Sequence, residues 1–562
     1  MFDVKRTVIS TRFKGVFVAS MVTMTASYIL ILTDNVVAGQ FVGADAVAAM
    51  TLISPLHGGF LFLAFLIADG LAMMYSYELG RQDREEADRL FGMGIIVSLI
   101  FSVLCLLSLI FGRDAILSMW DISPHLMDLA GDYYDALMWL PPFMFFEIFL
   151  YTILIAEGEE KLCTNSAIVT FFVNVGLDFV LCNLMGVYGL GLATVIGRAS
   201  ALPILCLFFM RKNCRITFRR YFNIVKAARG MLYSFCSSID MLCASIFMVI
   251  MPFCIIKYFG EEHIIVATTV INVMSLLISL YYGVVDCLQP MVCQYYAEGS
   301  LWSVKKTMRI GMLATNAMSL IVMAAGLIFA PAFPIMFGVE DEAIIEEAAF
   351  ALRIYLPSII FFGATLMYAN YYIYTERRIW GSALKVLLQL VLPTAGMWIG
   401  VLFGLTGFWI GFSASFAAAF ALNWVRLKGN LLWIDEKEFD RQLTYDINAT
   451  FDEVMALTLR ADEDLQRMGI DVMKRNLIVM WIEELGLMEV DRSNGEEFQI
   501  EISILTGREP KLMIVRDNGA PLSDEVKNNL SFRENFIELM SASLYSRKYL
   551  SSGDENRLVI EI

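Results

Sequence analysis

The chain has 562 residues, of which 58% are hydrophobic and 18% are charged. A soluble domain is about 45–50% apolar and about 25% charged, so this composition excludes a soluble globular protein and indicates a polytopic membrane protein. The net charge of −15 is uneven, because residues 430–562 carry 15 Lys and Arg against 27 Asp and Glu. An acidic tail behind an apolar body predicts two parts that face different solvents.

Cysteines and basic segments disfavour two further classes of protein. The ten cysteines form no paired metal spacing and only three histidines are present, so we expect no metal site and no disulfide framework. No basic segment interleaved with aromatic residues suggests a nucleic-acid partner. The basic first residues lead into a long apolar span without a small-residue cleavage site, which predicts a retained first helix rather than a removed signal peptide.

Twelve apolar spans are expected to cross the bilayer as helices, since about 20 residues rising 1.5 Å each suffice. In chain order they lie at 16–38, 47–79, 91–112, 133–156, 164–184, 188–210, 230–258, 264–296, 310–330, 346–374, 380–403 and 406–427. Basic residues gather in alternate connecting segments, and the longest basic run is Arg211–Gly230. The positive-inside rule therefore predicts that these segments, both termini and the acidic tail are cytoplasmic.

The membrane part is predicted to be a tandem repeat. Four features recur at a near-constant offset along the chain: Gly43 and Gly260, Asp69 and Asp286, Pro141 and Pro357, and Gly186 and Gly404. This offset predicts two six-helix bundles, 1–210 and 230–428, related by a parallel pseudo-two-fold axis and joined by a linker at 211–229. Two bundles around a central cavity suit alternating access, whereas a channel would need a selectivity ring. The expected fold is an all-α membrane protein of twelve transmembrane helices with a small cytoplasmic α+β domain at 435–562.

Two acids stand out within these spans. Asp178 follows Asn174 by four residues in the span Thr164–Leu184, so both side chains share one helical face. An ionisable group at that depth costs about 2.5–3.5 kcal/mol on insertion scales. Asp34 lies at a similar depth in the first span. We therefore expect Asp178 to face an internal, wetted cavity and to exchange a proton or small cation; the alternative is a hydrogen-bonded structural acid between two helices.

Further charged side chains lie inside the spans. Asp69 and Asp286 occur in both halves, and either they face each other as counter-charges for a cationic substrate or they repeat a helix-packing contact. Glu147 and Arg198 are interpreted as a structural ion pair in preference to substrate contacts. Asp240 is a further charged residue inside a span and a candidate for the substrate pathway.

One histidine, His57, lies inside a span and is interpreted as a satisfied polar residue, with a place in a proton path as the alternative. The 41 Phe and 33 Met mostly fill the core and face lipid. Those that line a cavity would suit varied apolar cations.

Several stretches resemble the multidrug and toxic compound extrusion (MATE) transporters. The first span with TDNVVAGQFVGADAVAAM is similar to their first helix and loop, and NVGLDFVL followed by GVYGLGLATVIG is similar to their fifth and sixth helices. The resemblance covers about residues 10–427. It implies that Asp34, Asn174 and Asp178 form the cation or proton site that drives export.

The same resemblance implies that the site is asymmetric. The repeat mate of Asp34 is Met251, and the mate of Asp178 falls beside Pro393 and Thr394. The second bundle is therefore expected to lack a matching acidic site.

The tail reads as α+β. Thr444–Gly469 and Val472–Val490 are predicted to be helices, and 498–506, 511–519 and 557–562 are predicted to be strands. This order resembles the histidine-kinase-like ATPase fold, in its anti-sigma-factor kinase branch. The resemblance implies a nucleotide-binding ancestry for the tail.

The local match is best at the segment DNGAP after a strand, where Asp517 and Gly519 resemble the adenine-binding box. Glu484 matches the glutamate of the family, but the position of its magnesium-holding asparagine is Met488, and no glycine-rich lid is visible in Ser531–Ser552. Phosphoryl transfer is therefore not expected, and the chain is predicted not to be an enzyme. A degenerate regulatory or docking domain is favoured, and residual nucleotide binding stays an alternative.

Together these features predict a MATE-like antiporter in the cytoplasmic (plasma) membrane of a bacterium. It would export organic cations or drugs against H⁺ or Na⁺, with membrane lipids and a small cationic molecule as partners and no other cofactor. A regulatory protein would dock on the tail. The alternatives are a flippase or exporter of a lipid-linked or anionic metabolite, and a membrane sensor that signals through the tail.

Overall fold

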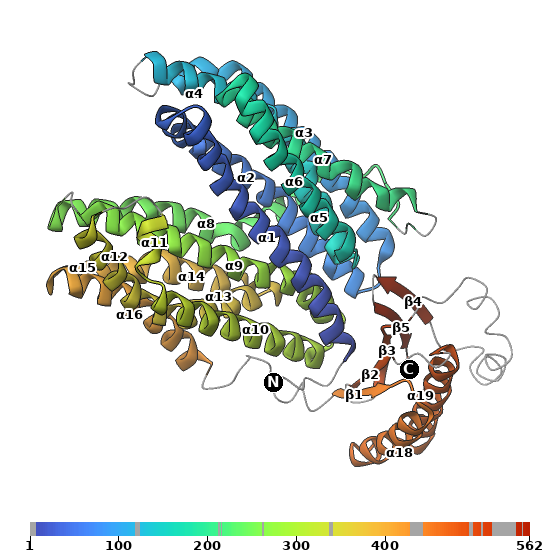
Figure 1. The fold of residues 1–562 in the computed structure, drawn as a ribbon. Helices are drawn as coiled ribbons and strands as arrows, with labels where there is room; N and C mark the ends of the chain where they lie inside the picture. Colours follow the sequence, from blue (N-terminus) through green and yellow to red (C-terminus); the bar gives the residue numbers. More distant parts are fainter. Residues whose placement is uncertain are drawn as a thin grey trace.

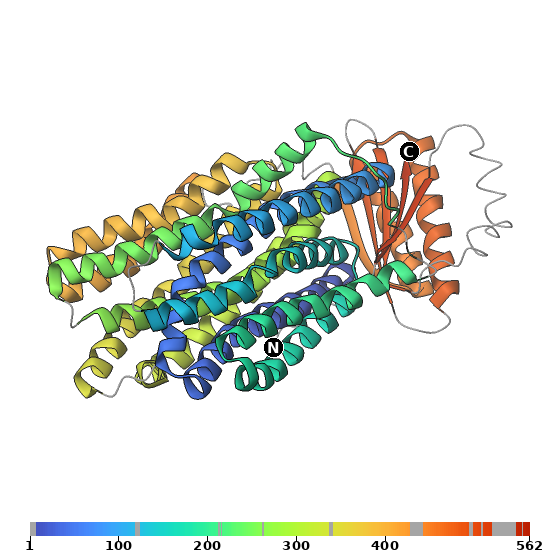
Figure 2. The same cartoon turned by 90° about the horizontal axis from the view of Figure 1, so that it is seen from above.

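The structure is a computed structural model of the chain. It describes residues 7–118, 124–211, 214, 216–260, 263–336, 341–427, 442–493, 498–506, 510–519, 547–552 and 555–561. Two helical bundles lie beside each other, and a smaller domain with a β-sheet lies at one end of them (Figures 1 and 2).

The first bundle contains seven α-helices and ends in a 3₁₀ turn. They are α1 (Val8–Phe41), α2 (Ala44–Gly80), α3 (Arg84–Leu117), α4 (Pro124–Leu137), α5 (Leu140–Ala156), α6 (Glu160–Met185), α7 (Val187–Cys206) and η1 (Leu207–Met210). The axes of α4 and α5 meet at 45°, where Pro141 and Pro142 lie in the first turn of α5. Proline lacks an N–H group and is tolerated at that position.

The second bundle repeats this pattern with more interruptions. Its elements are α8 (Ile224–Phe259), α9 (Ile264–Ala297), α10 (Leu301–Ile328), α11 (Ala332–Met336), α12 (Glu342–Tyr355), η3 (Leu356–Ser358), α13 (Ile359–Tyr374), α14 (Arg378–Val386), η4 (Leu387–Val391), α15 (Leu392–Val401) and α16 (Gly404–Arg426). The segment η4 is a π-helical turn just before Pro393. Such turns relieve a strained helix and often mark functional sites.

The number of membrane spans is lower than expected when length and composition alone are counted. In the part of the chain that the structure describes, ten helices qualify, or eleven if the bent pair α4 and α5 is one span. The helix α1 stands outside this set. The second bundle also begins earlier than residue 230, because α8 starts at Ile224 with Asn223 as its N-cap.

The backbone of the two halves is duplicated at the turns. Among the described residues up to 427, positive φ occurs at positions that form four pairs with nearly the same offset: Gly43 and Gly260, Gln82 and Gly299, Gly158 and Glu376, and Gly186 and Gly404. Left-handed backbone is rare for residues other than glycine. Its recurrence at a near-constant offset shows the same turn conformations in both halves.

The bundles pack closely at the end next to the β-sheet domain, called here the domain end, and diverge towards the other end (Figure 1). A Cβ at Gly70 of α2 would lie 1.8 Å from the carbonyl oxygen of Gly230 of α8, so this approach requires glycine. Hydrogen bonds join the bundles at this end: Arg12 Nη2 to Gln294 Oε1 (2.8 Å), Gln294 Nε2 to Ala156 O (2.9 Å), Tyr77 OH to Tyr374 O (2.9 Å) and Gln289 Nε2 to Asp69 O (3.1 Å).

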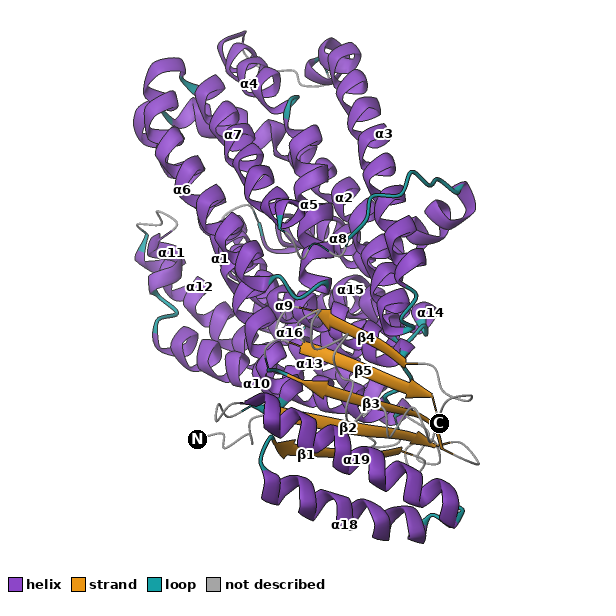
Figure 3. Ribbon diagram, turned by 90° about the vertical axis from the view of Figure 1, so that its right-hand side faces the viewer, coloured by secondary structure: helices purple, strands orange, loops and turns teal. Residues whose placement is uncertain are grey.

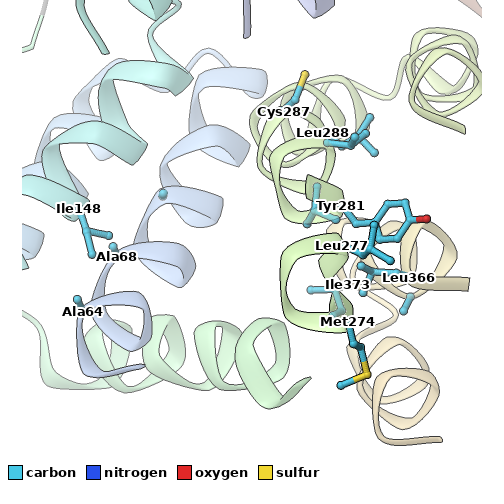
Figure 4. Close-up of a cluster of buried hydrophobic side chains, with 14 of the residues drawn as sticks. Ala64, Ala68, Ile148, Met274, Leu277, Tyr281, Cys287, Leu288, Leu366 and Ile373 are labelled. Carbon is cyan, nitrogen blue, oxygen red and sulfur yellow. The ribbon is translucent and has the colours of Figure 1, made fainter. Parts of the chain in front are cut away.

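Buried apolar side chains fill both bundles. In Figure 4, Ala68 and Ile148 lie in the first bundle, while Leu277, Leu288 and Leu366 gather on facing helices of the second. Each bundle therefore has apolar packing of its own, and the polar side chains described below lie between the two.

The C-terminal domain is a five-stranded antiparallel sheet in the order β1-β2-β3-β5-β4. The helices α18 (Phe451–Arg467) and α19 (Val472–Ser493) cover one face (Figure 3), where Leu465 and Trp481 pack with Ile502. The strands are β1 (Gln442–Asn448), β2 (Gln499–Thr506), β3 (Pro510–Asp517), β4 (Arg547–Ser552) and β5 (Glu555–Glu561).

One predicted helix of this domain was wrong at its start. The prediction of a helix over Thr444–Gly469 fails for its first residues, because these form β1 and pair with β2. The physical reason is a period of two: Leu443, Tyr445 and Ile447 face the core of the domain, and the residues between them are polar. The strand β4 was also missed.

The other face of the sheet docks on the turn between α9 and α10 through a buried ionic cluster. Arg516 of β3 pairs with Glu298 of that turn and with Glu501 of β2, and Arg557 of β5 also pairs with Glu298. Arg516 Nη1 donates to Ser303 Oγ at 2.9 Å. All four charged side chains are at most 2% exposed. Opposite charges that neutralise one another at this depth favour a fixed docking position.

Candidate functional site

A cavity of about 410 Å³ lies between the two bundles. Its walls come from α1, α2, α5, α6 and α7 on one side and from α8, α9, α13 and α14 on the other. Most of the lining is apolar, and the polar side chains fall into two groups. We call them the acid pair, which is Asp34 and Asp178 with Asn174, and the floor cluster, which is Asp69, Asp240, Asp286 and Lys385.

The acid pair joins α1 to α6. The carboxyl groups of Asp34 and Asp178 lie within hydrogen-bonding reach of each other. With its amide oriented to satisfy both groups, Asn174 donates to Asp178 Oδ2 at 3.0 Å and accepts from the backbone N–H of Thr194 at 3.2 Å. Asp34 and Asn174 line the cavity, whereas Asp178 is fully buried beside them. The expected cavity exposure therefore belongs to Asp34, through which Asp178 is connected to it.

The chemistry of the acid pair follows from its oxygens. Two carboxylates at this separation disfavour double ionisation, so a shared proton or a bound cation stabilises the pair. Asp34 Oδ1 and Asp178 Oδ1 are both buried and have no hydrogen-bond partner among the described residues. Carboxylate and amide oxygens suit a proton and equally a hard cation such as Na⁺.

A glycine on α7 positions Asn174. A Cβ added at Gly197 would lie 2.9 Å from the Cβ of Asn174. The absence of a side chain there lets α6 and α7 approach, and this approach brings the amide of Asn174 to the backbone of Thr194.

The ion pair interpreted from the sequence is present at the cavity wall. Arg198 Nη1 lies 3.1 Å from Glu147 Oε2, and the two side chains are 20% and 13% exposed. Both residues line the cavity, as does His57, and the charge of Arg198 acts on His57. Because the charges of Arg198 and Glu147 cancel, the net charge of the cavity is set by its other acidic and basic side chains.

The floor cluster lies where the bundles close. Lys385 Nζ is 2.9 Å from Asp240 Oδ2, and both side chains are 1% exposed. Tyr282 also donates its hydroxyl to Asp240, and Lys385 donates to the carbonyl oxygen of Ser237. Asp240 is thereby neutralised within the second bundle.

The remaining acids of the floor cluster come from different bundles. Asp69 lies on α2 and accepts a hydrogen bond from Ser237 of α8. Asp286 lies on α9, and the charge of Asp69 acts directly on it. The structure thus brings the two repeat-related acids to one place, as counter-charges would require.

The comparisons with known proteins identify the family. A family model described as MatE matches residues 19–180 and 237–391, which is more than half of the chain. This chain belongs to the MatE family. Members of this family are membrane transporters, and the two matched ranges correspond to the two bundles described above.

One curated protein and several solved transporter structures are also similar to this chain. The probable multidrug resistance protein YoeA of Bacillus subtilis is 26% identical over 208 residues, which is 35% of this chain and 44% of that relative. An outward-facing multidrug resistance MATE transporter of the MOP superfamily has a TM-score of 0.70 at 20% identity, covering 76% of this chain and 98% of its own. A MOP superfamily transporter from Pyrococcus furiosus has a TM-score of 0.69 at 21% identity, covering 75% and 96%. At such identities the solved structures show a common fold.

Lys385 is one residue of this MatE chain that the sequence analysis missed. It is the only charged residue in the span expected at 380–403. A lone cation in an apolar span predicts a buried acidic partner. The sequence could therefore have flagged Lys385, although it could not have named Asp240 as the partner.

The residues expected to contact nucleotide lie in the C-terminal domain, away from the cavity. Asp517 ends β3, and its Oδ1 accepts from the backbone N–H of Gly519 at 2.9 Å and from Asn556 Nδ2 at 2.8 Å. Glu484 lies on α19. Ala520, Pro521 and residues 531–546 of the expected lid lie outside the described residues. A carboxylate has two oxygens that together accept about four hydrogen bonds, so the nucleotide interpretation of Asp517 stays a prediction.

In the described part of the chain, no group of three or more His, Cys, Asp or Glu residues could hold a metal ion. The acid pair has only two carboxylates and one amide, which is a ligand set for an alkali cation or a proton.

Proposed function

We propose that this protein is a secondary active transporter that exports organic cations or drugs by proton- or sodium-coupled antiport. The observation that carries the proposal is the acid pair, which has two facing carboxyl groups and two buried oxygens without a partner among the described residues, at the wall of a cavity between two bundles. Such a pair binds one positive charge tightly and then loses it when the packing around it changes. It is a carrier site and not a catalytic site.

Coupling follows from a difference in affinity between two conformations. A ligand shifts an equilibrium only by the ratio of its affinities for the two states. When the pair holds a proton or cation, α1 and α6 are joined; when it is empty, like charges push them apart. One charge moving inward across 100 mV releases about 2.3 kcal/mol, which helps to drive export.

The orientation in the membrane rests on the basic residues. Arg81, Arg84 and Arg89 lie at the domain end of α2 and α3, and a bundle of twelve spans that includes α1 leaves both termini on this side. The positive-inside rule makes it the cytoplasmic side. The protein then spans the cytoplasmic membrane of a bacterium with its cavity opening outwards, and the C-terminal domain is cytoplasmic.

The charge of the cavity bears on the alternative functions. Among the lining residues, the described acids outnumber Arg198 and Lys385, and each of these cations is already paired with an acid. A negative cavity repels a lipid-linked phosphate or another anionic metabolite. A flippase for such a substrate is therefore the weaker candidate, and a membrane sensor is separated from an exporter by the transport experiment below.

The C-terminal domain is proposed to regulate transport by holding the turn between α9 and α10. The same α9 carries Asp286 of the floor cluster, so docking through Glu298 acts on a helix of the cavity. A regulatory protein that binds the domain would change this contact. Nucleotide binding at Asp517, Gly519 and Glu484 stays a second route to the same effect.

The test is gradient-driven efflux in reconstituted vesicles. Asp34→Asn and Asp178→Asn are each expected to abolish efflux of a fluorescent cation, because a neutral amide cannot exchange a charge at the pair. Dissipation of an imposed proton or sodium gradient on addition of the cation identifies the coupling ion.

The matched control is Asp114→Asn, since Asp114 has a side chain that is 97% exposed on α3. This variant is expected to transport as the unchanged protein does. Normal efflux in both acid-pair variants would reject the coupling site, and no efflux by the unchanged protein from vesicles would favour the sensor.

A further inference from the structure

We propose that Asp69 and Asp286, one from each bundle, hold the ammonium group of a substrate that is a protonated amine, together with the side-chain oxygen of Asn370. The proposal rests on the proposed transport function and deepens it by naming the chemical class that the cavity floor selects.

The first argument is the charge balance of the floor cluster. Of its three acids, Asp240 is neutralised by Lys385 at 2.9 Å and by the hydroxyl of Tyr282. Lys385 also donates to the backbone carbonyl of Ser237, and its charge acts on Asp69 and Asp286 as well. The single cation of the cluster therefore faces three carboxyl groups that line the cavity, and a bound ammonium would improve this balance.

The second argument comes from Asn370 on α13, which is independent of the acids. Its Nδ2 donates to the carbonyl oxygen of Leu366 at 2.9 Å, which fixes the amide orientation. Its Oδ1 is then a fully buried acceptor that lines the cavity and has no partner among the described residues. A buried acceptor without a donor is costly, and an N–H group of a ligand removes that cost.

The position of Asn370 links it to the two acids. One helical turn further along α13, Tyr374 shares its face and donates to the carbonyl oxygen of Val285, next to Asp286. The charges of Asp286 and Asp69 both act on Tyr374. Two carboxyl groups and one amide oxygen that line the same cavity match the three N–H donors of a primary ammonium.

The origin of the two acids in different bundles gives the site a conformational preference. Rocking of the bundles changes the separation of Asp69 and Asp286, so both reach one ammonium only when the domain end is closed. An amine bound there therefore favours closure of that end, because it binds more tightly to the closed state.

The experiment measures binding of two fluorescent probes to the full chain in detergent micelles. Monodansylcadaverine carries a primary ammonium, and its N,N,N-trimethyl analogue carries the same charge without N–H donors. We expect Asp69→Asn and Asp286→Asn each to weaken binding of the amine about tenfold or more, since a hydrogen bond to a charged group is lost. Asn370→Leu is expected to weaken the amine severalfold and to leave the trimethyl analogue unchanged.

Each outcome of the experiment decides one way. Unchanged amine affinity in both acid variants, or equal losses for the two probes in Asn370→Leu, would overturn the proposal. Asp114→Asn serves as the control. Thermal unfolding of each variant shows whether a loss of binding is caused by misfolding. If Asp69→Asn or Asp286→Asn does not fold, Asp69→Glu or Asp286→Glu replaces it, and a shift in amine affinity is again the expected result.

Failure of the coupling proposal is distinguishable. If Asp34→Asn and Asp178→Asn both transport normally while Asp69→Asn loses the amine, the substrate site stands and the coupling proposal is rejected.

Discussion

The two halves of the membrane part share a backbone but not a chemistry. Four pairs of positive-φ residues at a near-constant offset show that the turns were duplicated. Yet the first bundle has Asp34 where the second has the fully buried Met251. The ionic docking contact of the C-terminal domain is made to the second half, through Glu298, whose repeat mate Arg81 has a side chain that is 54% exposed.

The two halves therefore share the conformations of their turns, whereas most buried charged side chains occur in one half and not at the corresponding position of the other. A buried charge is costly unless it has a partner or a purpose. Among the described acids that line the cavity, Asp69 and Asp286 are the pair at which both halves carry an acid, and the charge of Asp69 acts on Asp286.

The largest effect is expected when an acid is placed in the second half at the position that corresponds to Asp34. Met251→Asp puts a carboxylate into a fully packed apolar site. We expect a loss of about 4–6 kcal/mol in the free energy of unfolding, from the inserted charge and the lost apolar burial. SDS-induced unfolding in micelles measures it.

The reciprocal variant in the first half is the control for this prediction. Asp34→Met is expected to fold with little change in the free energy of unfolding, because an apolar residue in place of a buried charged group is often neutral. An equal loss in the two variants would show that the halves do not differ in this way.

The second prediction concerns the ionic contact between the C-terminal domain and the second half. Arg516→Met leaves Glu298 and Glu501 buried without one of their cations, and breaking a buried pair in this way costs about 3–5 kcal/mol. We expect the domain to undock, with faster hydrogen exchange at the turn between α9 and α10 and altered transport rates.

The control for this change is Arg467→Met on α18, since Arg467 has a side chain that is 74% exposed. That variant is expected to exchange like the unchanged protein. Slow exchange at the turn in Arg516→Met would show that apolar contacts, and not the ionic cluster, hold the domain.

The smallest expected effect tests the shared backbone itself. Gln82 has φ of 58° where its repeat mate Gly299 has φ of 82°. Gln82→Gly should stabilise the protein by about 1 kcal/mol, and Gly299→Ala should destabilise it by a similar amount, because left-handed backbone strains any residue with a Cβ. A Cβ at Gly299 lies 3.7 Å from Leu505, an ordinary contact, so crowding does not explain the second effect. Opposite signs in unfolding measurements check the prediction, and equal signs would contradict it.

Much of the membrane fold could be predicted from local patterns. Apolar spans predicted the helices, and a near-constant offset predicted the two halves, since a duplicated gene keeps its spacing. The predictions failed where a short segment can form either a helix or a strand. Thr444 and the residues next to it precede a helix but have the alternation of a strand, and they form a strand because they pair with β2. The short strand β4 depends on pairing with β5 and carries no local signal of its own.

The candidate site was predictable only where its residues are close in sequence. Asn174 and Asp178 share a helical face by their spacing, and Asp34 joined them through a family resemblance. Lys385 and Asp240 lie far apart in the chain, so their ion pair needed the packing of α14 on α8. The acceptor role of Asn370 likewise required knowledge of which amide atom is already bonded.

Three features followed from the sequence alone: an apolar part and an acidic part, a duplication, and acids inside the apolar spans. These are local or periodic properties of the sequence, so they can be predicted from the cost of burying charge and the gain from burying apolar side chains. Only the tertiary structure decided which acids meet, which of them Lys385 neutralises and where the sheet docks. Those outcomes depend on contacts between residues far apart in the chain. Such contacts form, and contribute to stability, only when the bundles pack together.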